Sequence, residues 1–308
     1  MSWESIAELI NMAEKSGQSL GATALAREAE DQGAPAQELM AQMISYLAVM
    51  EDAVHRGLAE PIRSERGVGR GQAPKLARYA ETCTTLSGRE TILVAAMATA
   101  VMEVNAGMGR IVAAPTAGSS GILPAVVVSV SERLQLQREQ VALALFAAGA
   151  VGMVIANHAG ISGAEGGCQA EVGSAAAMAA AAAVEMAGGT PRQAGAAVAL
   201  MLKNVLGLVC DPVAGLVEVP CIKRNGMYAA MAILAADMAL AGVDSIIPAD
   251  EVITAMAEVG RTIPVALRET AQGGLAATPT GQRLMAKLQG QGVGVGGSTA
   301  AGVAPLLG

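Results

Sequence analysis

The sequence is poor in aromatic residues, in charge and in histidine. Aromatic side chains make up 2% of the 308 residues and charged side chains 15%, and the histidines are His55 and His158. Sheets favour β-branched and aromatic pairs, whereas Ala, Leu and Met favour closely packed helices. Because period-two strand patterns are also missing, the sequence predicts an all-α fold. An average soluble domain is about 25% charged, so we expect another subunit to cover part of the surface.

Several classes of function are excluded by what is missing. With a net charge of −7 and a pI of about 5.0, the chain has no Lys and Arg cluster long enough to bind nucleic acid. The longest apolar run, 141–156, has 16 residues, whereas crossing a bilayer takes roughly 20. We interpret it as a buried helix and expect no membrane contact. The first ten residues contain Trp3 and two glutamates where a secretory signal would be basic and then apolar, so we expect a cytoplasmic protein.

The pattern of apolar and polar residues divides the chain into four regions. Residues 1–60 have apolar side chains at helical spacing and predict an N-terminal helical segment. Residues 61–75 are charged, glycine-rich and without period, which indicates a loop or hinge. Residues 76–289 predict a helical catalytic core with Gly- and Pro-rich loops. The uncharged, glycine-rich stretch 290–308 predicts a flexible tail or a segment that orders on a partner.

Capping motifs predict where several helices begin. Ser87, followed three residues later by Glu90, has the spacing of a capping box, and so has Thr190 with Gln193. The stretch 174–186 is almost pure alanine, which predicts a helix able to approach its neighbours closely.

The first stretch that could bind a ligand is the turn PTAGSSG, which runs into an apolar segment from Ile122. Such a turn before a helix directs N–H groups and hydroxyls at one place, which favours a carboxylate or phosphate; a plain capped turn is the alternative. It is not a Walker loop, because no Gly-Lys-Ser/Thr follows. The candidate binding residues are Thr116, Ala117, Gly118, Ser119, Ser120 and Gly121.

Three of the four cysteines lie beside glycine or proline rather than within an apolar helix. Cys168 and Cys210 are separated by 41 residues, and Cys210 and Cys221 by 10, spacings that match no common zinc finger or ferredoxin. Three independent core thiols, a three-thiolate metal site and a catalytic thiol all remain open, with zinc competing against an iron–sulfur cluster. Cys83 lies apart near a helix start, and we interpret it as structural.

Histidine offers few choices for an acid or base. His158 precedes Cys168 by ten residues and could approach the site, or it could be an ordinary polar residue at a helix end. With two histidines in the chain, the base that takes a proton could come from another chain.

Four stretches closely resemble the alpha subunit of bacterial iron–sulfur L-serine dehydratases. They are residues 104–126, 161–191, 202–227 and 267–281, with the motifs PTAGSSG, GGCQAE, CDPVAG and VPC, and the likeness runs from about residue 5 to residue 289. The resemblance implies a largely α-helical catalytic domain. It also implies a [4Fe–4S] cluster on Cys168, Cys210 and Cys221, and a substrate carboxylate at the PTAGSSG turn. Ser162 and Asn225 are further candidates for lining the pocket.

The resemblance also implies a reaction and a partner. The family's lyase reaction converts L-serine to pyruvate and ammonia: an open iron binds the hydroxyl, a base takes the Cα proton, and no pyridoxal phosphate is used. Single-chain members carry an additional N-terminal domain with histidines, so we expect a separate beta subunit and a hetero-oligomer. Some members also end in a cysteine that reaches the open iron, whereas this sequence ends in Pro-Leu-Leu-Gly, which leaves the fourth ligand open.

Two alternatives to serine dehydration remain open. A zinc-stabilised helical scaffold that only binds a partner would use the same three thiolates. The same cluster could also act on L-cysteine or L-threonine.

Overall fold

The structure, a computed structural model, describes residues 3–64 and 68–290, and within these ranges the chain is helical without a β-strand. This confirms the predicted all-α fold. Short 3₁₀ turns and one π-helix, η2, interrupt the longer elements. In chain order the described elements are α1 (Ile6–Ser16), α2 (Leu20–Gln32), α3 (Ala36–Ala59), α4 (Ala73–Thr82), α5 (Arg89–Ala106), η1 (Ala117–Ser119), α6 (Ile122–Leu134), α7 (Arg138–Ala159), α8 (Gly163–Gly166), η2 (Gln169–Gly173), α9 (Ser174–Met186), α10 (Pro191–Lys203), η3 (Val213–Gly215), α11 (Cys221–Leu240), α12 (Ala249–Thr262), η4 (Val265–Leu267), η5 (Gly274–Ala277) and α13 (Pro279–Gly290).

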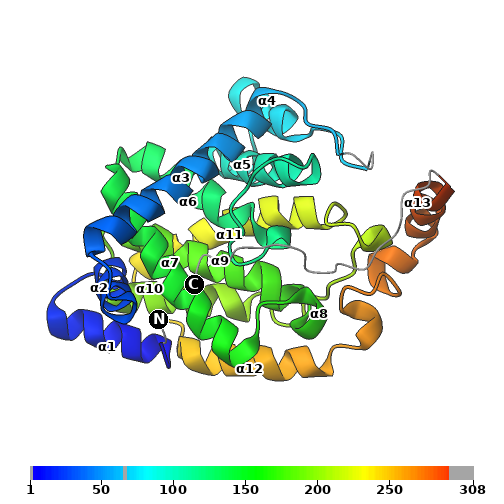
Figure 1. The fold of residues 1–308 in the computed structure, drawn as a ribbon. Helices are drawn as coiled ribbons and strands as arrows, with labels where there is room; N and C mark the ends of the chain where they lie inside the picture. Colours follow the sequence, from blue (N-terminus) through cyan, green and yellow to red (C-terminus); the bar gives the residue numbers. More distant parts are fainter. Residues whose placement is uncertain (1–2, 65–67, 291–308) are drawn as a thin grey trace.

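The alanine-rich helix α9 forms the centre of the fold. Every residue of α9 except Glu185 is buried, and α6, α7, α10 and α11 pack around it (Figure 1). Alanine side chains allow neighbouring helix axes to approach the lower end of the usual range of about 8–10 Å. The predicted helix 174–186 is confirmed, and α9 continues directly from η2, which carries part of the candidate site.

Helix α7 is the one helix in the described ranges that is long and apolar enough to cross a membrane. It has 22 residues and extends the predicted run at both ends, but 67% of its most apolar window is buried inside the fold. Its neighbours are α2, α3 and α9. The apolar side chains of α7 therefore contribute to the protein's own core.

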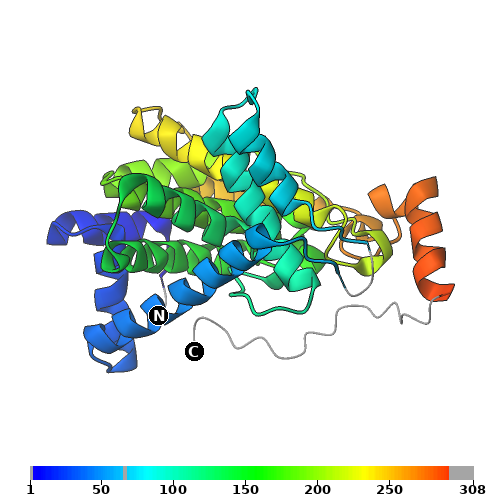
Figure 2. The ribbon, with the colours of Figure 1, turned by 90° about the horizontal axis from the view of Figure 1, so that it is seen from above.

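The helices predicted for residues 1–60 are α1, α2 and α3, and they share one hydrophobic core with the remainder of the chain. The loop between α3 and α4 falls in the predicted loop 61–75. It is hydrogen-bonded to the segment that precedes α11, because the N–H of Gly69 donates to Glu218 Oε2 at 2.5 Å. At the other end of the chain, α13 lies apart from the main bundle (Figure 2). Residues 291–308 of the predicted tail lie outside the described residues.

The two predicted capping boxes have different outcomes. At α10 the box is confirmed: Thr190 Oγ1 accepts from the Gln193 N–H at 3.2 Å, and Gln193 Oε1 accepts from the Thr190 N–H at 2.8 Å. At α5 the box is wrong, although the helix begins close to the predicted start. Gly88, at φ +88°, takes the N-cap position and no side chain caps the helix. The Glu90 carboxylate instead accepts from Arg89 Nη1 at 2.7 Å.

Two helical glycines provide a test of how closely this core is packed. A Cβ added at Gly57 would lie 2.5 Å from the carbonyl oxygen of Ala100, whereas one at Gly149 would meet nothing within 4 Å. Replacing an unconstrained helical glycine by alanine stabilises by about 0.5–1 kcal/mol, while overpacking costs about 1–3 kcal/mol. We expect Gly57→Ala to lower the free energy of unfolding and Gly149→Ala to raise it, as measured by denaturant titration. A change of the same sign in both variants would contradict this packing.

Candidate metal centre

Three loops bring the cysteines predicted as ligands to one end of the bundle. Cys168 lies between α8 and η2, Cys210 lies in the segment that follows α10, and Cys221 is the first residue of α11. All three thiols are free and buried, with 1%, 3% and 5% of the residue exposed, respectively. Figure 1 shows α8 on the side of the bundle that faces α13. Sequence reasoning anticipated that these segments meet, although they are distant along the chain.

Two of the sulfurs form a compact group with a carboxylate. Cys168 Sγ, Cys210 Sγ and a carboxylate oxygen of Glu171 all lie within 4.8 Å of one another. Cys221 is not part of that tight group. Burial raises the pKa of the Cys221 thiol, and the negative charges of Cys168 and Glu171 raise it further, so this thiol shares their electrostatic environment. The structure thus brings two predicted ligands together with the third nearby, and adds Glu171, to which sequence reasoning gave no role.

The electrostatics of the sulfur group favour a bound cation. The pKa of Cys210 is raised first by its hydrogen bond with Cys168, then by burial, then by neighbouring negative charge. Burial also raises the pKa of Glu171, against the lowering effect of its hydrogen bond with Thr116. Both shifts mean that burial disfavours the charged forms of the Cys210 thiol and the Glu171 carboxyl. A metal ion or cluster that bound here would stabilise the thiolates and release their protons.

Glycine permits the close approach of the segments that carry the sulfurs. A Cβ at Gly163 would lie 2.8 Å from Cys210 Sγ. Gly167 has φ +77°, and a Cβ there would lie 2.9 Å from the carbonyl oxygen of Leu208. The N–H of Gln169 donates to that same carbonyl at 3.0 Å and fixes the two segments to each other. The π-helix that follows, η2, is a feature found frequently at functional sites.

The segment from 264 to 271 holds Cys210 from its other side. The Cys210 N–H donates to the Leu267 carbonyl at 2.9 Å, and the Cys210 carbonyl accepts from the Glu269 N–H at 2.7 Å. Glu269 and Ala271 have φ +62° and +55°, a conformation that non-glycine residues adopt rarely and that clusters at functional sites. Burial raises the pKa of Glu269. Residues 267–281 carried part of the family resemblance, but sequence reasoning assigned Glu269 no role.

One buried ion pair supports the cysteine loop. Arg224 Nη2 lies 2.9 Å from Asp211 Oδ1, and Arg224 Nη1 donates to the Val209 carbonyl at 2.9 Å. The other oxygen of Asp211 accepts from the Leu275 N–H at 2.8 Å. Burial alone would lower the pKa of Arg224, but the charges of Cys168 and Asp211 outweigh it and raise that pKa. Arg224 therefore places a positive charge beside the sulfur group.

The PTAGSSG turn lies against this group. Thr116 Oγ1 donates to Glu171 Oε1 at 2.5 Å and is 3.0 Å from Ser119 Oγ. A Cβ at Gly118 would collide with the Glu171 carboxylate. Residues Ala117–Ser119 form the short 3₁₀ turn η1, and Gly118 and Ser119 within it are buried. The proximity fits the predicted carboxylate-binding role of the turn, which stays a prediction.

Part of the turn already has partners within the protein. The Ser120 hydroxyl donates to the Ala117 carbonyl at 2.8 Å, and the Gly121 N–H donates to Asn225 Oδ1 at 3.0 Å. Asn225 is fully buried and its amide nitrogen donates to the carbonyls of Gly118 and Cys221, both at 2.9 Å. Asn225 therefore connects the turn to α11, the helix that begins with Cys221. Its side chain supports the predicted pocket from below.

Removing the Asn225 amide is expected to destabilise the site. Asn225→Ala leaves buried partners without a hydrogen bond, each at a cost of about 1–3 kcal/mol, so we expect the free energy of unfolding to fall by about 2–4 kcal/mol. Asn204 is the matched control, since its exposed side chain bonds only the Leu200 carbonyl at the end of its own helix. Asn204→Ala should change stability by less than about 0.5 kcal/mol. Equal effects in denaturant titrations would contradict a bracing role for Asn225.

The remaining candidates are placed as follows. Ser162 caps α8 by accepting from the Ala164 N–H at 3.2 Å, and it directly precedes Gly163 beside Cys210. His158 Nε2 lies 2.7 Å from the Glu4 carbonyl at the exposed end of α7, and no contact of its ring with a cysteine is recorded among the described residues. Cys83 is exposed and directly follows α4, and its interpretation as a structural residue stays a prediction. The catalytic role considered for His158 stays a prediction.

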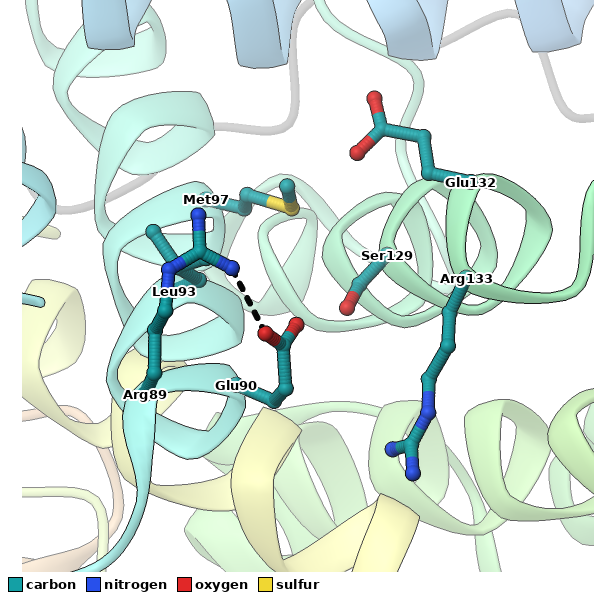
Figure 3. A pocket seen from close by; sticks show the side chains of 7 residues that line it. All are labelled: Arg89, Glu90, Leu93, Met97, Ser129, Glu132 and Arg133. Carbon is teal, nitrogen blue, oxygen red and sulfur yellow. Dashed lines mark hydrogen bonds and ion pairs between the residues drawn. The ribbon is translucent and has the colours of Figure 1, made fainter. Parts of the chain in front are cut away.

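Two surface pockets lie away from the sulfur group. A pocket of about 430 Å³ lies between α5, which contributes the ion pair of Arg89 and Glu90, and α6, which contributes Ser129 and Arg133 (Figure 3). A second, of about 520 Å³, is more apolar and extends onto α11 at Met227 and Leu234, which are both exposed. Neither pocket is lined by a residue of the sulfur group.

Known proteins match this chain over most of its length. The model of the family described as "Serine dehydratase alpha chain" matches residues 6–276. A Bacillus subtilis protein named "Probable L-serine dehydratase, alpha chain" is 52% identical over 299 residues, which are 97% of this chain and 99% of that protein. "L-serine dehydratase, alpha chain" from Peptoniphilus asaccharolyticus is 43% identical over 277 residues, covering 90% and 95% of the two chains. "L-serine dehydratase" from Streptomyces coelicolor is 40% identical over 277 residues, covering 87% of this chain and 59% of that protein.

Proposed function

Because the chain belongs to the serine dehydratase alpha chain family, we propose that it is the cofactor-bearing subunit of a lyase that converts L-serine to pyruvate and ammonia. The observation that carries the proposal is the convergence of Cys168, Cys210 and Glu171 within 4.8 Å, beside the PTAGSSG turn. A site for an electrophilic metal thus adjoins a turn able to receive a carboxylate. Metal-assisted dehydration of serine would use both, the metal at the hydroxyl and the turn at the carboxylate.

The cofactor we propose is a [4Fe–4S] cluster held by Cys168, Cys210 and Cys221, without pyridoxal phosphate. The residues fit such a group: the thiols are buried, glycine lets the backbone approach, and Arg224 balances part of the negative charge. When bound, the cluster would supply a Lewis-acidic iron that stabilises the charge of the departing hydroxide.

The chain's own residues bind and orient the substrate in this proposal. Thr116 and the N–H groups of Ala117 and Gly118 receive the substrate carboxylate, held in place by the Asn225 amide. Glu171, hydrogen-bonded to Thr116, lies between that turn and the sulfurs. The burial of the cysteines excludes bulk water from the centre.

We propose that a beta subunit completes the enzyme in a cytoplasmic hetero-oligomer and contributes the base that takes the Cα proton. The names of the Bacillus and Peptoniphilus relatives, which call them alpha chains, support a second type of subunit. The exposed Met227 and Leu234 and the low charge of the chain are consistent with a surface covered in an assembly.

Metal analysis tests the proposal directly. After anaerobic purification, iron and acid-labile sulfide in similar amounts, with an absorption and EPR spectrum that changes on addition of serine, would support it. The second candidate function is a zinc-stabilised scaffold that only binds its partner. It is favoured by the same observation, since two thiols and a carboxylate also suit zinc. Zinc without sulfide, and no pyruvate formed from serine, would establish the scaffold.

The choice of amino acid requires a separate comparison. We expect turnover of L-serine to exceed that of L-cysteine and L-threonine, in line with the names of the relatives. Product formation from the three amino acids, measured side by side with one anaerobic preparation, decides it. A preference for cysteine or threonine would retain the proposed cofactor and change the proposed substrate.

A further inference from the structure

We propose that the Glu171 carboxylate is the resting ligand of the one iron that no cysteine holds, and that the substrate oxygen replaces it. The inference rests on the proposed function, because it presupposes a cluster on Cys168, Cys210 and Cys221. It assigns a metal-binding role to a residue outside the cysteine set. The step is a ligand exchange in which one oxygen donor replaces another, without oxidation or reduction.

Position singles out Glu171 from the other acidic residues around the site. Its carboxylate lies within 4.8 Å of the sulfurs of both Cys168 and Cys210, and no other group of this kind is recorded among residues 3–64 and 68–290. Asp211, although adjacent to Cys210, uses its two oxygens for Arg224 and the Leu275 N–H. Glu171 is therefore the carboxylate best placed to share a metal with these thiols.

The two oxygens of Glu171 have different surroundings. Oε1 accepts from Thr116 Oγ1 at 2.5 Å, so it is anchored to the turn proposed to bind the substrate carboxylate. Oε2 lies 3.3 Å from the Cβ position of Gly163, and that position is also 2.8 Å from Cys210 Sγ. One oxygen is thus fixed by a hydrogen bond while the other lies on the side of the sulfur. Carboxylates that bind metals are commonly oriented by such a hydrogen bond.

Exposure indicates which side of the sulfur group the substrate reaches. Cys168 and Cys210 are buried, whereas Glu171 retains partial exposure. Glu171 lies in the π-helical turn that begins directly after Cys168, and its carboxylate lies within 4.8 Å of the Cys168 sulfur. A ligand at the accessible edge, attached to the substrate-binding turn, can leave when the substrate arrives.

Electron–nuclear double resonance tests the assignment in the wild-type protein. It measures whether the oxygen of isotope-labelled water is coupled to the electron spin of the cluster. The full-length chain, purified anaerobically in the complex in which it is isolated, is reduced to its EPR-active form and transferred to labelled water. We expect no strongly coupled solvent oxygen in the resting wild-type protein, because the carboxylate occupies the position. A strong coupling to labelled water in the resting wild type would overturn the inference without any variant.

Two matched variants provide the second measurement. In Glu171→Gln, which retains an oxygen for the Thr116 hydrogen bond, we expect the solvent coupling to appear. Conversion to the three-iron EPR signal by mild oxidant should also become at least about tenfold faster, as when a metal site loses a supporting group. Glu165→Gln, an exposed neighbour in α8, should behave as the wild type. Identical coupling and identical rates in Glu171→Gln and the wild type would refute the assignment.

The same preparations separate this inference from the proposed function. A wild-type protein that contains no iron and no sulfide would overturn both. A wild-type protein with a complete cluster whose resting iron carries solvent would overturn the role of Glu171 alone. If Glu171→Gln does not retain a cluster, the wild-type resonance measurement still decides the question.

Discussion

Replacing Cys210 by alanine is expected to leave a folded chain that retains neither iron nor sulfide and dehydrates serine at least about a thousandfold more slowly. A Lewis-acidic metal contributes several kcal/mol to such a step, and each 1.36 kcal/mol is a factor of ten in rate. Iron and sulfide analysis after anaerobic purification, together with pyruvate formation, measures both effects.

We expect loss of metal without loss of the fold because the side chain and the backbone of Cys210 have different partners. The thiol belongs to the group with Cys168 and Glu171, so its removal leaves one sulfur and one carboxylate in that group. The backbone hydrogen bonds to Leu267 and Glu269 do not involve the side chain and remain available in the variant. Far-UV circular dichroism and the unfolding midpoint should therefore change little while metal content falls.

Cys83→Ala is the matched control for this experiment. Cys83 is exposed and lies outside the sulfur group, so its replacement should leave iron, sulfide and activity unchanged. A Cys210→Ala protein with full iron and sulfide content would show that the cluster, if present, is held elsewhere. Loss of metal in both variants would indicate damage unrelated to ligation.

The helices were largely predictable because they follow from local signals. The alanine run of α9 and the Thr190 capping box of α10 each act within a few residues, and the structure matches both. The predicted Ser87 cap failed for a local reason as well: Gly88 adopts φ +88° and takes the cap position itself. The spacing of apolar residues does not indicate where a glycine will adopt a positive φ.

The cysteines were recognisable because glycine or proline accompanies each, which marks a backbone that turns around something. Their partners were not. Glu269 meets Cys210 through a backbone hydrogen bond between residues 59 positions apart, and no spacing rule encodes such a contact. Glu171 is different, because its position three residues after Cys168 was a usable signal. An acidic residue a few positions from a cysteine that is predicted to bind metal should therefore be considered as a further ligand when a sequence is analysed.

Asp211→Ala is expected to lower the free energy of unfolding by about 3–5 kcal/mol, the usual cost of removing one partner of a buried ion pair. The Asp211 and Arg224 side chains are 4% and 16% exposed, so the guanidinium left behind would be enclosed without its counter-charge. The Leu275 N–H would lose its acceptor as well. Denaturant titration of the anaerobic protein measures the loss.

A surface ion pair of similar length provides the comparison. Arg138 Nη2 lies 2.9 Å from Glu51 Oε2, but these side chains are 48% and 29% exposed. Removal of an exposed pair costs about 1 kcal/mol or less because water already screens it. Glu51→Ala should therefore change stability far less than Asp211→Ala. Similar losses in the two variants would contradict the structural role of the buried pair.

The double variant Asp211→Leu with Arg224→Met tests whether the ion pair serves only the stability of the fold or also the metal centre. Replacing both members of a buried pair by apolar residues is often neutral or stabilising, so we expect much of the lost stability to return. Iron content should not return with it, because Arg224 also places its charge beside Cys168 and holds the Val209 carbonyl next to Cys210. Recovery of both properties would mean that the pair matters to the fold alone. Recovery of stability without iron would show that Arg224 serves the metal centre, through its charge or through its hydrogen bond to the Val209 carbonyl.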